Sequence, residues 1–329
     1  MSTRNVALAS VLLVLPAVSA AQSSAPAAEI PRTAWGAPDL QGVYDFGSAI
    51  PLQRPVELGD RAVLTEEEAA VLEQRAAELF NDEVNRDSLT PPNYNHFWFE
   101  FGTTVADTLQ SSLIVDPPDG RIPPVTAAEE QRRAAHDAGG GYPVRVLGGG
   151  IGMAGPEDRG LAERCILGFN AGPPIVPASY NNYLQVFQTP DHVVIFTEMV
   201  HDARIIPLDG RPHLPSHIRQ WMGDSRARWE GDTLVIESSN YTPKRGYNIS
   251  WMNVVGTGET MQLTERLTRV NANTLIYEYT YDNPEMFTQP FSASIPLART
   301  DEGAVFEYAC HEGNYGMMNI LSGARSAGE

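Results

Sequence analysis

A short stretch of the chain carries most of the residues that can move protons. Residues 183–229 hold four of the seven histidines, and the run Glu198-x-x-His201-Asp202-x-Arg204 lies there between two apolar segments. Charged groups in an apolar hairpin are costly unless they are paired or used. An imidazole beside a carboxylate is a workable general base, and an arginine can stabilise negative charge. This pattern predicts His201 as acid/base, with Asp202 or Glu198 orienting it, and Arg204 as a substrate-binding group.

The alternative is a structural role, in which Arg204 and Asp202 form an ordinary ion pair and His201 caps a loop. A second candidate group follows the last expected strand, where we interpret His311 as another proton-transfer group and Tyr315 as a hydrogen-bond donor. Polar loop residues are further candidates for substrate binding, or simply satisfy loop backbone: Asn170, Asn182 and Arg219.

His213 and His217 have the i, i+4 spacing that suits a metal on a helix. Pro212 and Pro215 make a regular helix doubtful there, so we expect no metal and no other cofactor. Metal-assisted hydrolysis remains the alternative, with Glu198 or Asp224 as the third ligand.

Two carboxylates further along the chain have a second interpretation. Glu265 and Glu278 fall on paired strands, where facing carboxylates resemble the spacing of retaining glycosidases. Ordinary neutralisation by Arg266 and Arg269 is favoured instead.

Composition limits the partners. The chain has 329 residues and a formal net charge of −18 at pH 7, which disfavours nucleic acid and anionic membranes. We therefore expect a small-molecule or oligosaccharide ligand.

The N-terminus predicts export. Residues 1–20 have a basic residue, an apolar run of about 13 residues and a small-residue cleavage site, and about 20 residues are needed to span a bilayer. We interpret 1–20 as a signal peptide and 21–34 as a linker, giving a secreted or periplasmic protein. In an oxidising compartment Cys165 and Cys310 can form one disulfide, or remain two buried thiols.

The rest of the chain, residues 35–329, reads as one mainly β domain. Helical insertions are expected at about 64–80 and 126–138, each beginning with a capping box, Thr65/Glu68 and Thr126/Glu129. Period-two patterns then predict four hairpins: 183–188 with 192–199, 226–229 with 233–238, 261–270 with 274–281, and 291–297 with 304–309. Successive hairpins form an antiparallel meander, and open edges aggregate. We therefore expect a calycin- or lipocalin-like barrel of about eight to ten strands.

Five long segments resemble a family of secreted bacterial proteins of unknown function. They are SLIVDPPDGRIPP (112–124), ERC-x-x-GFNAGPP (163–174), TPDHVVIFTEMVHDARIIPLDGRPH (189–213), GDSRARWEGDTLVIE (223–237) and YACHEGNYG (308–316). The resemblance covers most of the chain after the signal peptide and implies export, but it implies no mechanism.

The residues lead to three functional hypotheses. The first is a cofactor-independent enzyme of the lyase, hydratase or isomerase type, with hydrolase next, acting on a polar substrate such as a sugar or an oxidised aromatic compound. The second is a lipocalin-like carrier with an apolar interior and polar groups only at the rim. The third is the metal-assisted hydrolase.

Overall fold

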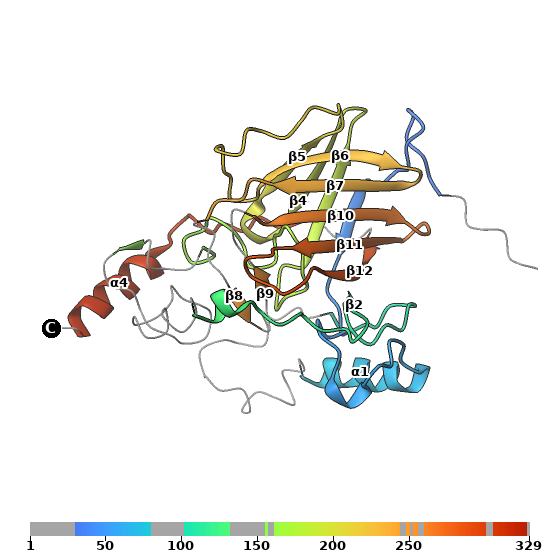
Figure 1. The fold of residues 1–329 in the computed structure, drawn as a ribbon, viewed down its shortest axis with the longest axis horizontal. Helices are drawn as coiled ribbons and strands as arrows, with labels where there is room; N and C mark the ends of the chain where they lie inside the picture. Colours follow the sequence, from blue (N-terminus) through green and yellow to red (C-terminus); the bar gives the residue numbers. More distant parts are fainter. Residues whose placement is uncertain are drawn as a thin grey trace, which may run out of the picture.

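The computed structural model describes residues 30–79, 102–131, 155–156, 161–243, 248–250, 253–255, 260–300 and 305–327. The predicted signal peptide and most of the predicted linker lie outside these ranges. Within them the chain forms a ten-stranded antiparallel sheet, a two-stranded sheet and few helices (Figure 1). The mainly β prediction is confirmed. Within the same ranges, no helix has the length and apolar character needed to cross a membrane.

The large sheet follows the order β5-β4-β3-β1-β12-β11-β10-β7-β6, and β2 also pairs with β12. Its strands are β1 (Gly42–Asp45), β2 (Ile114–Asp116), β3 (Tyr183–Gln188), β4 (His192–Thr197), β5 (Ala203–Pro207), β6 (Asp224–Glu230), β7 (Thr233–Ser239), β10 (Gln262–Arg269), β11 (Thr274–Asp282) and β12 (Phe291–Thr300). The small sheet pairs β8 (Asn248–Ser250) with β9 (Asn253–Val255).

The helical elements whose bounds are described are η1 (Val56–Leu58), α1 (Glu66–Leu79), η4 (Met199–His201) and α4 (Tyr315–Ala327). The first capping box is confirmed, because the Glu68 N–H donates to Thr65 Oγ1 at 3.2 Å and the Thr65 N–H donates to Glu68 Oε2 at 3.0 Å. Thr126 caps the second helix through the Glu129 N–H, and residues 127–131 are helical. The remainder of the predicted 126–138 helix lies outside the described residues.

Three of the four predicted hairpins are present, as β3–β4, β6–β7 and β10–β11. The fourth is wrong, since residues 305–309 form no strand. One edge of β12 is paired with β11, and its other edge is shared by β1 and β2. On that edge β1 pairs with 298–300 and β2 with 292–293, so a following strand could not pair along it, and the chain leaves the sheet after β12.

The sheet curls but is not closed by backbone pairing. Because every neighbouring pair is antiparallel, the two terminal strands, β5 and β6, run in the same direction and begin at the same end of the sheet. They lie side by side, and Arg204 of β5 donates to Ser225 Oγ of β6 at 3.1 Å. The end at which both strands begin, called the site end below, is the left side of Figure 1, where α4 also lies.

Side chains fill the concave face of the sheet. Alternate residues of each strand point to this face, and those of β11 alone bury Tyr277, Tyr279 and Tyr281 at 0–1% exposure. Tyr281 stacks on Phe291 at 5.3 Å between ring centroids. The interior of the sheet is therefore a packed core with a few polar groups inside it.

Candidate functional site

The turn between β4 and β5 has an unusual backbone. Val200 and His201 both adopt left-handed conformations, with φ values of 61° and 46°. A β-branched residue is a genuine outlier there, and each such residue costs about 1–3 kcal/mol. The Thr197 N–H donates to the Asp202 carbonyl at 2.9 Å and the His201 N–H to the Glu198 carbonyl at 3.0 Å, which hold the turn closed. Such strain is typical of functional sites.

A small apolar cluster supports this turn from below. Met199, Val200 and Ala171 are buried together. A Cβ on Gly168 would lie 2.1 Å from Met199 Cγ, so the close approach of the two segments requires glycine. The strained turn is thus held from its buried side by the 168–171 segment.

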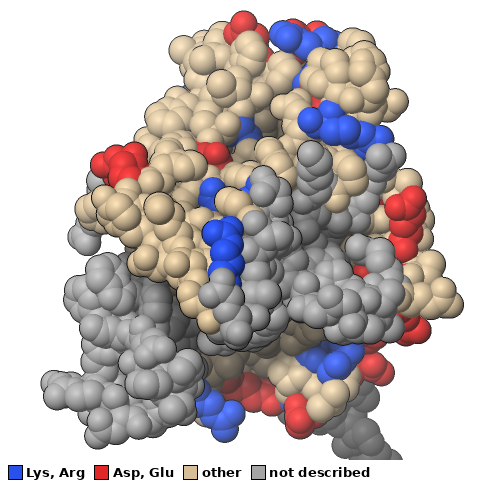
Figure 2. Space-filling model, turned by 90° about the vertical axis from the view of Figure 1, so that its left-hand side faces the viewer, with Lys and Arg blue, Asp and Glu red and all other residues tan. Residues whose placement is uncertain are grey.

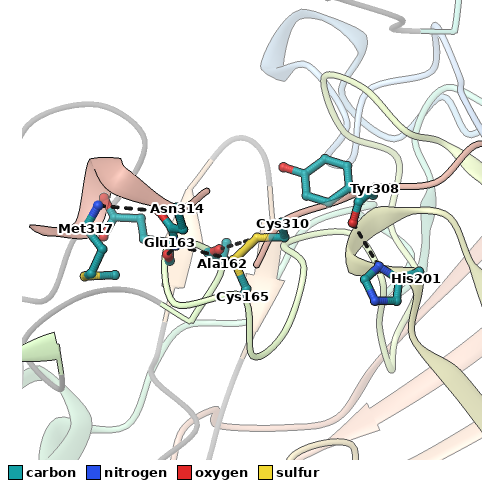
Figure 3. The surroundings of a disulfide bond; sticks show 8 residues. All are labelled: Ala162, Glu163, Cys165, His201, Tyr308, Cys310, Asn314 and Met317. Carbon is teal, nitrogen blue, oxygen red and sulfur yellow. Dashed lines mark hydrogen bonds between the residues drawn. A yellow bond between two sulfur atoms is a disulfide. The ribbon is translucent and has the colours of Figure 1, made fainter. Parts of the chain in front are cut away.

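The segment that follows β12 lies over the turn. Glu198 Oε1 accepts a hydrogen bond from the Phe306 N–H at 3.2 Å, and His201 Nδ1 lies 2.8 Å from the Tyr308 carbonyl oxygen (Figure 3). A carbonyl oxygen can only accept, so in the neutral ring Nδ1 carries the hydrogen and Nε2 keeps its lone pair. His201 is exposed, and this bond therefore prepares Nε2 as a proton acceptor.

Asp202 is the acidic partner at this turn. Its Oδ2 is buried and has no hydrogen-bond partner among the described residues. Burial raises the pKa of Asp202, and the nearby His201 and His311 lower it in part. The fold therefore brings together three of the predicted catalytic residues, whereas Glu198 is buried and binds backbone.

A disulfide fixes the overlying segment. Cys165 and Cys310 are bonded, with their Cα atoms 5.6 Å apart, so the disulfide alternative is confirmed (Figure 3). Asn314 Nδ2 adds a hydrogen bond to the Glu163 carbonyl at 2.9 Å. His311 follows the bridged cysteine directly, so the disulfide holds it within electrostatic range of Asp202, where its charge lowers the pKa of that carboxyl.

Arg204 does not lie at this site. It points into the sheet and forms a bidentate ion pair with Glu265, at 2.8 and 2.6 Å, where the two side chains are 4% and 0% exposed. Tyr277 also donates to Glu265 Oε1 at 2.8 Å. Burial opposes the charged guanidinium, but the attraction of Glu265 outweighs it and raises the pKa of Arg204. The predicted substrate-binding role is therefore replaced by a buried structural pair.

The burial of Glu265 and its pairing with Arg204 were not predicted from the sequence. The signal was available, because Leu263, Glu265 and Leu267 alternate on the buried face of β10. Glu265 faces Tyr279 in the register, whereas Glu278 faces Arg266 and is exposed. The two carboxylates lie on opposite faces of the sheet, so a glycosidase-like pair is excluded.

The predicted polar ligand contacts lie elsewhere. Asn170 Nδ2 donates to the carbonyls of Tyr180 and Asn181 at 3.0 Å, and Asn182 exchanges two hydrogen bonds with the Ala178 backbone. Arg219 donates to the Tyr241 carbonyl at 3.4 Å, and Tyr315 is 73% exposed at the start of α4. The two asparagines thus satisfy loop backbone, the alternative raised for them.

His213 and His217, the histidines of the metal alternative, have different surroundings. His213 Nδ1 lies 2.8 Å from Asp224 Oδ2, while His217 is exposed in a turn. Across the described ranges, no three or more His, Cys, Asp or Glu side chains gather where they could hold a metal ion. Asp224 is thus the hydrogen-bond partner of His213 rather than a third ligand beside both histidines.

The chain matches no protein-family model and no curated protein. The family resemblance of its motifs therefore stays a prediction, and the function of the candidate site is inferred from the geometry of its residues.

We expect Asp202→Asn to stabilise the fold at neutral pH. The unfolded Asp202 loses its proton near about pH 4, while burial lets the folded protein keep that proton to higher pH. The free energy of unfolding of the wild type therefore falls as the pH rises from the pKa of Asp202 in the unfolded chain to its raised pKa in the folded protein. Asparagine does not titrate, so the Asp202→Asn variant does not undergo this loss. Differential scanning calorimetry should show a melting temperature about 1–2 °C above wild type at pH 7.

Below about pH 4 both states of the wild type are protonated, so the difference should disappear. Glu312→Gln, at the exposed carboxylate that follows His311 in the chain, is the matched control and should leave the melting temperature unchanged. A lower melting temperature for Asp202→Asn at pH 7 would mean that the ionised carboxylate stabilises the turn.

Proposed function

We propose that the protein is an exported, cofactor-independent enzyme that performs acid–base chemistry of the lyase, hydratase or isomerase type at the turn 198–202. The observation that carries the proposal is the adjacent pair His201 and Asp202 at a turn whose backbone is left-handed at Val200 and His201, with the imidazole tautomer set by the Tyr308 carbonyl. The third proton-transfer group of this proposal is His311, which follows the bridged Cys310 and lies within electrostatic range of Asp202.

The chemistry follows from the state of each group. His201 Nε2 has a free lone pair in the neutral ring and accepts a proton from a C–H or O–H group of the substrate. Asp202, whose pKa is raised, holds a proton more readily than an ordinary aspartate and can donate it to the leaving group. A base and an acid of this kind support elimination, addition of water or isomerisation of a sugar or an oxidised aromatic compound.

The carrier alternative is not favoured. It needs an apolar interior that is open to a ligand, whereas here the interior holds buried tyrosines and the Arg204–Glu265 pair. We propose that the sheet is a calycin-like barrel in which side chains rather than backbone join β5 to β6, with the reactive groups at one end. The disulfide and the N-terminal pattern support secretion or periplasmic export after removal of residues 1–20.

The proposal predicts that His201→Ala loses about a hundredfold or more in turnover while the fold survives. The exported protein would be incubated with a panel of uronate oligosaccharides and hydroxylated aromatic acids, and new double bonds followed by ultraviolet absorbance. His192→Ala is the matched control, because His192 begins β4 at the opposite end of the sheet. Wild-type turnover by folded His201→Ala, or no turnover by the wild type on either class, would contradict the proposal.

A further inference from the structure

A second imidazole–carboxylate pair stands outside the site described above. Asp224 opens β6, and its side chain is 4% exposed. Its Oδ2 accepts hydrogen bonds from His213 Nδ1 at 2.8 Å and from the Leu214 N–H at 3.0 Å. Arg226 Nη1 lies 2.8 Å from Oδ1 and balances the negative charge of the carboxylate. Asp224 is thereby a fixed acceptor aimed at one nitrogen of His213.

The surrounding loop is built to hold this pair. Gly223 has φ +73°, and a Cβ there would lie 2.7 Å from the Ser239 carbonyl oxygen, so only glycine allows the tight entry into β6. Asn240, itself left-handed, donates from Nδ2 to the Leu214 carbonyl at 2.8 Å. The residue after His213 is therefore anchored at both its N–H and its carbonyl, which fixes the imidazole on an otherwise irregular loop.

The geometry leaves one nitrogen of His213 for a ligand. Because Nδ1 donates to the carboxylate, Nε2 carries the lone pair, and the side chain is 33% exposed. This is the same preparation that the Tyr308 carbonyl provides for His201. Both rings thus carry their hydrogen on Nδ1, which donates to the buried Asp224 carboxylate in His213 and to the Tyr308 backbone carbonyl in His201.

Topology brings the two pairs to one end of the molecule. Asp202 immediately precedes β5 and Asp224 begins β6, and these strands start together at the site end, joined by the Arg204–Ser225 hydrogen bond. The loop that carries His213 returns along the top of Figure 1 to this end. Figure 2 looks onto it and shows both basic and acidic side chains in its upper part, the part where β5 and β6 lie in Figure 1.

We propose that His213, held by Asp224, is a further proton-transfer group for the same reaction, and that the substrate is a hydroxylated carboxylate of the uronate type. The inference depends on the proposed function and adds to it a residue and a substrate class. Histidines 201, 213 and 311 attract an anion when protonated, while Asp224 and Glu198 are already engaged by donors of the protein.

The step that these groups support is an elimination. One imidazole Nε2 accepts the proton from the carbon beside the carboxylate, and the electrons of that C–H bond form the C=C bond. The C–O bond at the next carbon breaks, and the other imidazole, in its protonated form, gives its proton to the leaving oxygen, taking for this substrate the acid role assigned above to Asp202. Water or an alcohol departs, and no oxidant or second reactant is needed.

Imidazole nitrogen NMR tests the site without requiring turnover. In the wild type, His213 should show a protonated Nδ1, and Asp224→Asn should remove this preference. With D-galacturonate as the probe, the signals of His201 and His213 should shift together with one dissociation constant. His213→Gln should weaken binding by about tenfold, because a charge-assisted hydrogen bond is lost. His217→Gln, on the same loop but exposed, should bind as the wild type does.

The outcomes separate the two proposals. If the probe shifts His201 but leaves His213 unchanged, or if His213→Gln binds normally, the second site is refuted, and the His201→Ala turnover result still judges the proposed function. If neither signal shifts, the uronate assignment is refuted. If His213→Gln fails to fold, the tautomer of His213 in the wild type and in Asp224→Asn tests the second site instead.

Discussion

Arg204→Ala is expected to lower the free energy of unfolding by about 3–5 kcal/mol. The guanidinium and the Glu265 carboxylate form two hydrogen bonds at 2.8 and 2.6 Å inside the sheet. Removing one partner leaves a carboxylate that is 0% exposed without its counter-charge, and Tyr277 alone cannot compensate for it. Urea denaturation followed by tryptophan fluorescence should show a lower midpoint with a similar slope.

A surface pair provides the matched control. Arg228 is half exposed and pairs with Glu230 and Glu237, so Arg228→Ala should cost about 0–1 kcal/mol. Arg204→Met combined with Glu265→Leu should be more stable than Arg204→Ala alone, because no buried charge then lacks a partner. If Arg204→Ala unfolds at the wild-type urea concentration, the two side chains are not paired in solution. Arg204 would then be free to bind substrate.

Loss of the disulfide is the second large effect that we expect. Cys165 and Cys310 are 145 residues apart, and cross-linking so long a loop removes much of the freedom of the unfolded chain. Replacing both with serine should lower the free energy of unfolding by about 2–4 kcal/mol. Calorimetry of the double variant and of the wild type in a reducing agent should give the same lowered melting temperature.

The bridge also positions the candidate site, which gives the variant a second phenotype. Without it, residues 305–311 are held over the turn chiefly by the contacts of Phe306 with Glu198 and of Tyr308 with His201. Hydrogen exchange of this segment should accelerate far more than that of β10 and β11, which are buried in the sheet. Equal protection of the segment in the reduced and oxidised protein would show that the disulfide does not order it.

Local signals were sufficient for several elements. The Thr65/Glu68 capping box, the period-two alternation of β3 and the short turns of three hairpins are determined by neighbouring residues. The proximity of His201 and Asp202 was also predictable, because they are adjacent in the chain. Adjacent residues on a regular strand would point apart, however, and it is the left-handed backbone of Val200 and His201 that departs from this geometry.

Pairings between distant segments were not predictable in the same way. Alternation along β10 assigns Glu265 to the buried face, but it cannot reveal that Arg204, 61 residues earlier, meets it there. Likewise, the apolar pattern of residues 304–309 resembles a strand, yet β1 and β2 already occupy the edge of β12. Edge occupancy is a property of the whole sheet.

The sequence by itself determined the β-rich class, most strand bounds, the first helix and the identity of the residues able to transfer protons. Tertiary structure decided which groups come together: His213 bonds Asp224 across a loop, Arg204 pairs with Glu265 in the core, and the disulfide holds His311 within electrostatic range of Asp202. The physical reason is that propensity, capping and alternation act over a few residues, whereas burial and charge pairing depend on chain topology.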